Sequence, residues 1–170
     1  QGGFWPDLRK RSAQQIADIG FDGYAVGGLS VGEGHQKMVE VLDFTTEHMP
    51  WEAPRYLMGV GRPLDLVEGV ARGIDMFDCV IPTRNARNAS LFLGDGSSLN
   101  MKNARHKQDP NPVEEDCDCL ACTRYSRGTL HHLYQRKEIL AYTLGSIHNL
   151  SVFHRFLRKA RTAVLDGVWE

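Results

Sequence analysis

Short apolar segments that end in glycine alternate with longer amphipathic segments through the first 81 residues of the chain. The expected strands are 21–26, 55–58 and 76–81, and the expected helices are 7–19, 36–48 and 64–72. Leu8, Ile16 and Ile19 fall near one face of the first expected helix, Gly20 ends it, and Pro63 suits the first turn of the third. This order is typical of right-handed βαβ units with a parallel sheet.

About four strands can be counted, including one implied before Gln1, whereas a closed (β/α)8 barrel needs eight strands and roughly 250 residues. We therefore predict an α/β fold that forms the C-terminal half of a (β/α)8 TIM barrel, in a piece of a longer protein. An open doubly wound sheet is the alternative. The barrel is favoured because each strand ends in residues suited to a site: 1–3, 27–29, 59–61 and 78–79.

The pattern changes after Pro82. Residues 90–93 and 98–101 are predicted to form a β-hairpin, because a Gly-Asp-Gly-Ser turn separates them. Three helices are expected after it, at 124–134, 137–144 and 149–165. We predict three domains: 1–88 as the barrel half, 89–148 as a hairpin with a zinc-binding subdomain inserted into the barrel, and 149–170 as the closing helix.

Cysteines gather at Cys117, Cys119 and Cys122 in a C-x-C-x2-C pattern, and His148 follows at a distance. Three thiolates and one imidazole are a common ligand set for structural Zn2+. The spacing leaves other fourth ligands open, namely His106, His131, His132 and His154, and three unrelated reduced cysteines are the simpler alternative. His148 is preferred because we expect it to open the last helix. Reduced cysteines also indicate a cytoplasmic setting.

Two acids, Asp75 and Asp78, interrupt the last apolar strand. An ionised carboxylate is costly to bury unless it is paired or used. Asp78 is nearer the C-terminal end of the strand and is the candidate nucleophile, whereas Asp75 is expected to pair with a neighbouring helix. A structural ion pair with an arginine is the alternative for Asp78. A nucleophilic aspartate usually acts with a second carboxylate that serves as general acid or base, and Glu33 is the only obvious candidate for it.

A basic turn with Arg84 and Arg87 is expected directly after this strand. Between residues 84 and 108 five basic residues face one acid, Asp95; the basic ones are Arg84, Arg87, Lys102, Arg105 and Lys107. Asparagines lie among them, and such a mixture suits phosphate and sugar contacts in RNA. A solvated surface is the alternative, since the formal net charge of -1 does not indicate a nucleic-acid-binding protein. No apolar run is long enough to cross a bilayer, and no signal peptide is apparent.

These stretches together resemble the tRNA-guanine transglycosylases, also called queuine tRNA-ribosyltransferases, of the bacterial type. The resemblance covers nearly the whole chain and rests on 1–3, 20–33, 55–61, 75–87 and the Cys–His set. It implies exchange of guanine at the wobble position of tRNA for the 7-deazaguanine base preQ1, with Asp78 as the nucleophile that forms a covalent adduct with ribose. It also implies that Cys117, Cys119, Cys122 and His148 bind a structural zinc.

The resemblance further assigns the base pocket and RNA contacts. Gln1, Gly28, Leu29 and Met58 match positions around the base, Tyr56 lies near them, and Glu33 matches an acid associated with the Gly28–Leu29 peptide. Arg84 and Arg87 match tRNA-contacting positions. Val31 favours preQ1 over queuine, because relatives that use queuine tend to have glycine there.

The resemblance also sets limits. The family's general base and a second base-reading aspartate belong to the other half of the barrel. We therefore expect residues 1–170 alone to be inactive, and a homodimer is expected for the whole protein. Two other functions remain as alternatives: a zinc-stabilised tRNA-binding module without chemistry, and an open-sheet hydrolase.

Overall fold

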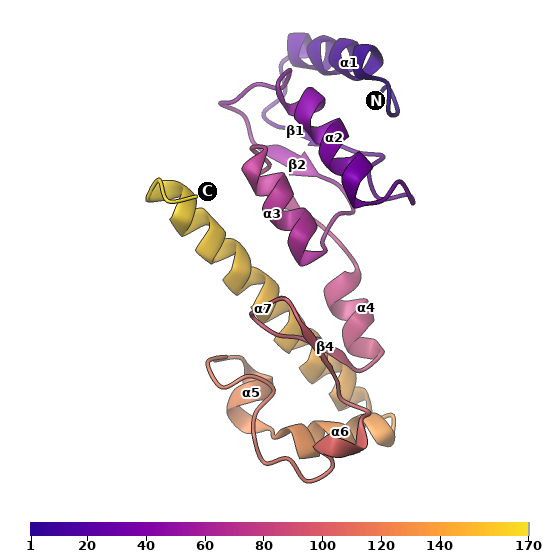
Figure 1. Cartoon of the computed structure of the whole chain (residues 1–170), viewed down its shortest axis with the longest axis vertical. Helices are drawn as coiled ribbons and strands as arrows, with labels where there is room; N and C mark the ends of the chain where they lie inside the picture. The colour runs from indigo at the N-terminus through magenta and orange to yellow at the C-terminus, as the bar shows by residue number, and fades with distance from the viewer. Residues whose placement is uncertain (170) are drawn as a thin grey trace. The chain divides into compact units, whose positions relative to one another are not determined.

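A three-stranded parallel sheet forms the centre of the first of two units in the computed structural model, which describes residues 1–169 (Figure 1). The sheet has the order β1-β2-β3, and its strands are β1 (Tyr24–Val26), β2 (Arg55–Leu57) and β3 (Met76–Phe77). Tyr24 pairs with Arg55, and Leu57 pairs with Phe77. The predicted parallel βαβ order is therefore confirmed for these strands.

Three helices accompany this sheet: α1 (Pro6–Ile19), α2 (His35–Thr46) and α3 (Pro63–Ala71). Proline occupies the first turn of α1 and α3, where its missing N–H removes no helical hydrogen bond. Gly20 ends α1 in a left-handed conformation (φ 79°). The core of the unit is apolar and comprises Val26, Leu29, Met38, Val41, Leu42, Met49, Leu57, Val60 and Ile74.

Helix α1 does not bury the face that its sequence indicates. Leu8, Ile16 and Ile19 are 51%, 39% and 67% exposed, and Arg9 is the one buried residue of the helix. The Arg9 guanidinium donates from Nε to the Gly3 carbonyl (2.7 Å) and from Nη2 to the Gly27 carbonyl (2.9 Å). These hydrogen bonds satisfy the buried cation, so α1 is attached to the end of β1 through a charged side chain.

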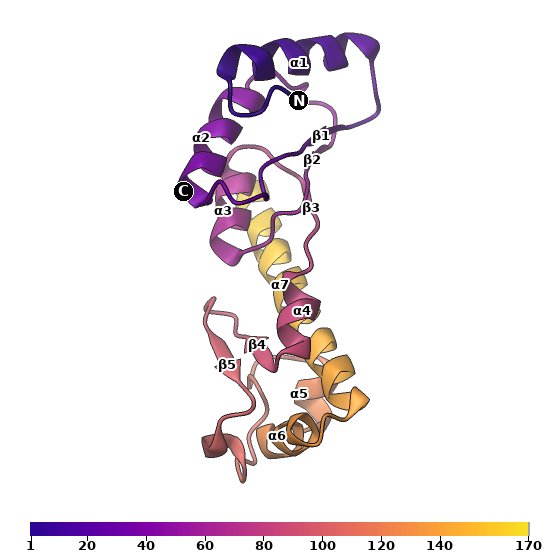
Figure 2. The ribbon, with the colours of Figure 1, turned by 90° about the vertical axis from the view of Figure 1, so that its right-hand side faces the viewer.

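The second unit begins at Ile81 and is built around one long helix, α7 (Ile139–Leu165). Against α7 pack a hairpin of β4 (Ser90–Phe92) and β5 (Ser98–Asn100) and three shorter helices, while η1 (Ala104–His106) contacts one of those helices (Figure 2). The helices are α4 (Ile81–Arg87), α5 (Leu120–Arg124) and α6 (Arg127–Gln135). The predicted hairpin is confirmed.

Two predictions about this region are wrong. The strand expected over 76–81 ends at Phe77, and Ile81 instead begins α4, so the basic turn is a helix. The two helices expected over 137–144 and 149–165 are one helix, α7, with His148 in its interior. Gly145 lies within α7 without breaking it. A Cβ at this position would lie 2.1 Å from the Tyr134 hydroxyl, so glycine permits close packing of α7 on Tyr134, and this packing keeps the helix continuous.

The chain divides into its two units between Val80 and Ile81, whereas we predicted a boundary after residue 88. Residues 81–88 and the described part of 149–170 belong to the same unit as 89–148, because α4 and α7 pack against each other and against β4. Within residues 1–169, every helix is too short or too polar to cross a bilayer.

Asn149 holds three segments of the second unit together. Its Oδ1 accepts from the Phe92 amide (2.8 Å), and its Nδ2 donates to the carbonyls of Pro82 (2.8 Å) and Ser90 (3.1 Å). The side chain is fully buried, so removing it would leave three backbone groups without a partner.

We therefore expect Asn149→Ala to lower the free energy of unfolding by about 3 kcal/mol or more, at about 1–3 kcal/mol for each unsatisfied buried group. Asn103→Ala is the matched control, since Asn103 is exposed and its side chain caps nothing; it should change the free energy by less than about 0.5 kcal/mol. Urea unfolding followed by circular dichroism measures both. Equal effects of the two substitutions would contradict this role.

Candidate active site and metal centre

The three clustered cysteines and His148 converge on one point. Their ligand atoms, three Sγ and the His148 Nδ1, all lie within 4.8 Å of one another. The Nδ1 is 3.8, 3.7 and 3.3 Å from the Sγ atoms of Cys117, Cys119 and Cys122. The structure therefore brings together the four predicted ligands, one on α7 and three in or just before α5.

The orientation of His148 fits metal binding. Its Nε2 lies 2.7 Å from the Phe92 carbonyl, which can only accept, so Nε2 carries the proton. The Nδ1 then presents its lone pair to the three sulfurs, as a metal-ligating imidazole must. The other candidate histidines lie elsewhere: His131 bonds to the Met101 carbonyl, His106 lies beside the Asp109 carboxylate, and His132 and His154 are exposed.

Charge in the cluster also favours a cation. A hydrogen bond from the Cys122 thiol lowers the pKa of Cys119 to about 3, whereas the same contact raises the pKa of Cys122. Burial raises the pKa of Cys117. Three buried thiolates cannot coexist without a positive partner, and a divalent cation supplies one. Three sulfurs and one nitrogen match the tetrahedral set that zinc prefers and leave no open position.

Asp78 lies just beyond the end of β3. Its Oδ1 accepts from the Tyr56 hydroxyl (2.6 Å) and from the Gly59 amide (2.7 Å). The hydrogen bond from Tyr56 contributes most to lowering the pKa of the Asp78 carboxyl, and the bond from Gly59 contributes next. The same contact with Asp78 raises the pKa of the Tyr56 hydroxyl. Asp78 is exposed, so its charge is not buried in the strand. Among residues 1–169, the ion pairs and hydrogen bonds described for Asp78 include no arginine.

Asp75 has a different role from Asp78. Its Oδ2 accepts from the Arg55 backbone amide (2.8 Å), and its own amide donates to the Arg55 carbonyl (2.9 Å). Asp75 therefore pairs with a neighbouring strand, β2, and not with a helix as predicted. Its carboxylate extends the pairing of β2 with β3.

The predicted base-pocket residues lie at the same edge of the sheet, because the strands are parallel. Gln1 lies against the end of β1: a Cβ at Gly27 would be 2.9 Å from its amide nitrogen, and one at Gly28 3.1 Å from its amide oxygen. Gly28 also has a positive φ of 73°, and Leu29 is buried. Met58 follows β2, is 43% exposed, and donates its amide to Val26.

Glu33 lies in the loop between β1 and α2. Its Oε2 accepts from the Val31 amide at 2.9 Å. Among residues 1–169, no hydrogen bond of the Glu33 side chain reaches the Gly28–Leu29 peptide. The carboxylate therefore stabilises the turn directly after that peptide.

Sequence reasoning missed two buried arginines, Arg9 near the carboxyl ends of the strands and Arg55 at the start of β2. Arg9 links the segment that carries Gln1 to Gly27, as described above. Arg55 is 1% exposed, donates to the carbonyls of Pro50 and Met49, and stacks 4.0 Å from the centre of the Trp51 ring. Arg9 precedes Lys10 and Arg11, so in the sequence it looks like part of a solvated basic run. For Arg55, the one available signal of burial was a charged residue at the start of a strand.

The predicted RNA-binding cations are all exposed and all lie in the second unit. Arg84 and Arg87 are on α4, Lys102 follows β5, and Arg105 is on η1. The charge of the chain divides at the same boundary. Residues 1–80 contain 7 Lys and Arg against 12 Asp and Glu, and residues 81–170 contain 13 against 9. The total of -1 therefore combines a first unit of -5 with a second unit of +4.

Comparison with known proteins gives a consistent result. The family model described as queuine tRNA-ribosyltransferase matches residues 1–170. Proteins named queuine tRNA-ribosyltransferase are 53% identical in Pseudoalteromonas atlantica, over 98% of this chain, and 54% identical in Mannheimia succiniciproducens, over 96%. The one from Pseudomonas putida is 52% identical over 98% of this chain. The chain spans 43–45% of the length of these relatives.

The cluster makes a testable prediction about metal content. We expect about one equivalent of zinc per chain, and Cys122→Ser should reduce it below half an equivalent and lower the unfolding midpoint. Cys79→Ser is the matched control, because Cys79 lies outside the cluster, and it should retain the metal. Elemental analysis after dialysis measures both. Full zinc content in Cys122→Ser would contradict the assignment.

The hydrogen bond from Tyr56 makes a prediction about pH. Because it lowers the pKa of Asp78, Tyr56→Phe should raise that pKa toward the ordinary aspartate value of about 3.9. The stability that the hydrogen bond contributes is present above this ordinary value and is lost as the pH falls through the lowered, folded-state pKa. Carboxyl-carbon NMR titration measures the shift. Tyr24→Phe removes a hydroxyl from β1 without touching Asp78 and should leave its pKa unchanged.

Proposed function

Because this chain belongs to the queuine tRNA-ribosyltransferase family, we propose that the protein containing it is a tRNA-guanine transglycosylase, a pentosyltransferase that exchanges guanine at the wobble position of tRNA for preQ1. The observation that carries the proposal is the presentation of Asp78: an exposed carboxylate with a lowered pKa, fixed at the strand edge that also carries the base-pocket residues.

Asp78 is the proposed nucleophile. Both described hydrogen bonds engage Oδ1, which leaves Oδ2 to attack C1′ of the ribose. The new Oδ2–C1′ bond forms as the bond from C1′ to guanine breaks, and guanine leaves with that electron pair. The incoming base then attacks C1′ and displaces the carboxylate. Two inversions give overall retention, as in other double-displacement reactions at a glycosidic carbon.

The base would lie against Gln1, Gly28, Leu29 and Met58, with Tyr56 beside them. Their chemistry suits a purine-like ring: the Gln1 amide can read base edges, Gly28 exposes backbone groups, and the Met58 thioether can cover a ring face. Glu33 can hold the turn after the Gly28–Leu29 peptide in either of two orientations. Val31 takes space next to this turn, which supports preQ1 over the bulkier queuine.

Arg84 and Arg87 would contact phosphates next to the target nucleotide, and Lys102 and Arg105 would extend this contact. The ion held by the Cys–His set is zinc with a structural role, since the four ligands complete its coordination. We further propose that the three strands belong to half of a (β/α)8 barrel in a cytoplasmic homodimer.

The rival function is a zinc-stabilised tRNA-binding module without chemistry. One observation favours it for residues 1–170 alone: the Glu33 carboxylate is engaged by the Val31 amide, and among residues 1–169 no second carboxylate is hydrogen bonded near Asp78. The described hydrogen bonds therefore give Asp78 no carboxylate partner that could act as general acid or base, and we propose that these residues are inactive without the rest of the protein.

A covalent adduct distinguishes the two functions. In the whole protein, Asp78→Asn should abolish the adduct with tRNA, seen as a denaturation-resistant band, and lower base exchange by at least about a thousandfold, because the amide is a poor nucleophile. Exchange is measured by incorporation of radiolabelled guanine. The control is Asp43→Asn, an exposed acid on α2 away from the strand ends. An adduct formed by Asp78→Asn would refute the assignment.

A further inference from the structure

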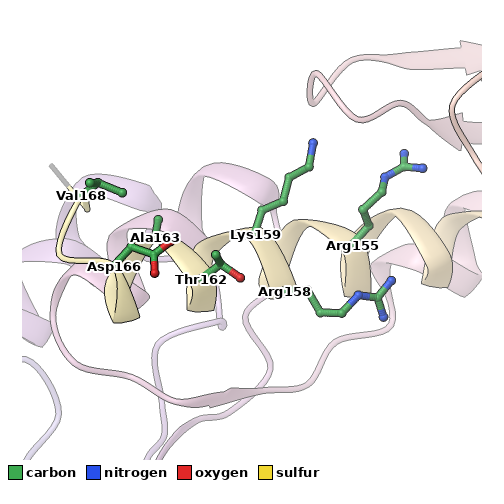
Figure 3. A pocket seen from close by; sticks show the side chains of 7 residues that line it. All are labelled: Arg155, Arg158, Lys159, Thr162, Ala163, Asp166 and Val168. Atoms are coloured by element: carbon green, nitrogen blue, oxygen red, sulfur yellow. The ribbon is translucent and has the colours of Figure 1, made fainter.

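The last turns of α7 present a shallow basic surface that the proposed reaction does not use. A depression of about 410 Å3 lies over it, lined by Arg155, Arg158, Lys159, Thr162, Ala163, Asp166 and Val168 (Figure 3). Figure 3 shows Arg155 and Lys159 reaching to one side of the helix, Arg158 to the other, and Thr162 between them. We call the four residues 155, 158, 159 and 162 the α7 basic surface.

The spacing of these residues puts them on one stripe of the helix. They follow the pattern i, i+3, i+4 and i+7, so their side chains lie on neighbouring turns. From Arg155 to Thr162 the stripe rises about 10 Å, at 1.5 Å per residue. This length is enough for the stripe to contact more than one phosphate of a nucleic-acid backbone.

Two of the cations are available to a ligand. Arg155 is already engaged by the Glu114 carboxylate and the Asp116 carbonyl, which anchors it in the fold. Arg158 and Lys159 are exposed, and none of the ion pairs and hydrogen bonds described among residues 1–169 uses their side-chain nitrogens. A surface of unpaired cations next to a hydroxyl donor is complementary to phosphate.

We propose that the α7 basic surface binds the phosphate backbone of the tRNA substrate, as a second contact besides the cations of α4 and its neighbours. This proposal rests on the proposed function for its partner. RNA is favoured over an acidic protein because residues 81–170, which carry this surface, have a net charge of +4, and the surface combines cations with a hydroxyl group, a mixture that suits phosphate and sugar contacts. Asp166 lies at the far end of the depression and repels phosphate, so the backbone lies between Arg155 and Thr162.

The experiment measures binding of a tRNA transcript with guanine at the wobble position to the whole protein at several salt concentrations. We expect Arg158→Ala/Lys159→Ala to weaken binding about tenfold near 0.1 M salt and to reduce the salt slope by about 2. Turnover at saturating tRNA should stay unchanged while the KM for tRNA rises. Asp166→Asn should tighten tRNA binding about twofold, an effect opposite in direction to that of Arg158→Ala/Lys159→Ala, because it removes a negative charge next to the phosphates.

Lys10→Ala/Arg11→Ala is the matched control, because it removes an adjacent, exposed lysine and arginine from α1, and none of the interactions described among residues 1–169 uses their side-chain nitrogens. Unchanged zinc content and unfolding midpoint would show that each variant is folded. If the α7 variant and the control bind tRNA equally well, the proposal is overturned. The proposed function still stands in that case, provided that the wild-type protein exchanges bases. A wild-type protein that neither binds tRNA nor exchanges bases overturns both. An α7 variant that loses binding to polyglutamate but keeps tRNA also overturns it, in favour of an acidic protein.

Discussion

The packing of the second unit depends on two hydrogen bonds from α7 to the backbone of Phe92. Two consecutive residues of the helix satisfy both of its polar groups: His148 donates to its carbonyl, and Asn149 accepts from its amide. The first of these bonds sets the tautomer that turns Nδ1 toward the three cysteines, and Asn149 also reaches Pro82 in α4. One backbone position therefore connects the hairpin, the long helix, the first helix of the unit and the metal cluster. A metal bound there would stabilise all of these contacts together, because it restrains His148.

The first unit fixes the carboxylate of Asp78, the proposed nucleophile, in a different way: the ends of its parallel strands converge. Gly59 follows β2 and supplies one hydrogen bond to Asp78, and Tyr56 within β2 supplies the other. Gly59 has a φ of 75°, which a larger residue would adopt with strain, and a Cβ there would lie 2.5 Å from the Ser30 hydroxyl. The loop after β1 thus packs on the residue that orients the carboxylate. The predicted base-pocket residues and Asp78 are therefore connected through the backbone of these loops.

Sequence reasoning succeeded where a single local rule decides the outcome. Periodicity and glycine placement located the three parallel strands, their helices and the hairpin, and cysteine spacing located three of the four clustered ligands. It failed where a tertiary contact overrides the local rule. Gly145 is a weak helix former, but packing against Tyr134 keeps α7 continuous. Arg9 is charged, but two carbonyls make its burial favourable while the apolar residues of α1 stay exposed. Such contacts join residues far apart in the chain, and no short window of sequence contains them.

The division of charge between the units has a chemical consequence. A carboxylate nucleophile must remain ionised and accessible, and the hydrogen bonds to Asp78 achieve this without a cation that would compete for its attacking oxygen. The surrounding unit is acidic and repels phosphate, so under the proposed function the attraction for a nucleic acid has to come from elsewhere. The second unit, which begins three residues after Asp78, is the proposed source, because its first helix carries Arg84 and Arg87. A guanidinium paired directly with Asp78 would also favour the ionised carboxylate, but it would occupy an oxygen that the proposed attack needs, whereas the described hydrogen bonds to Tyr56 and Gly59 both engage Oδ1.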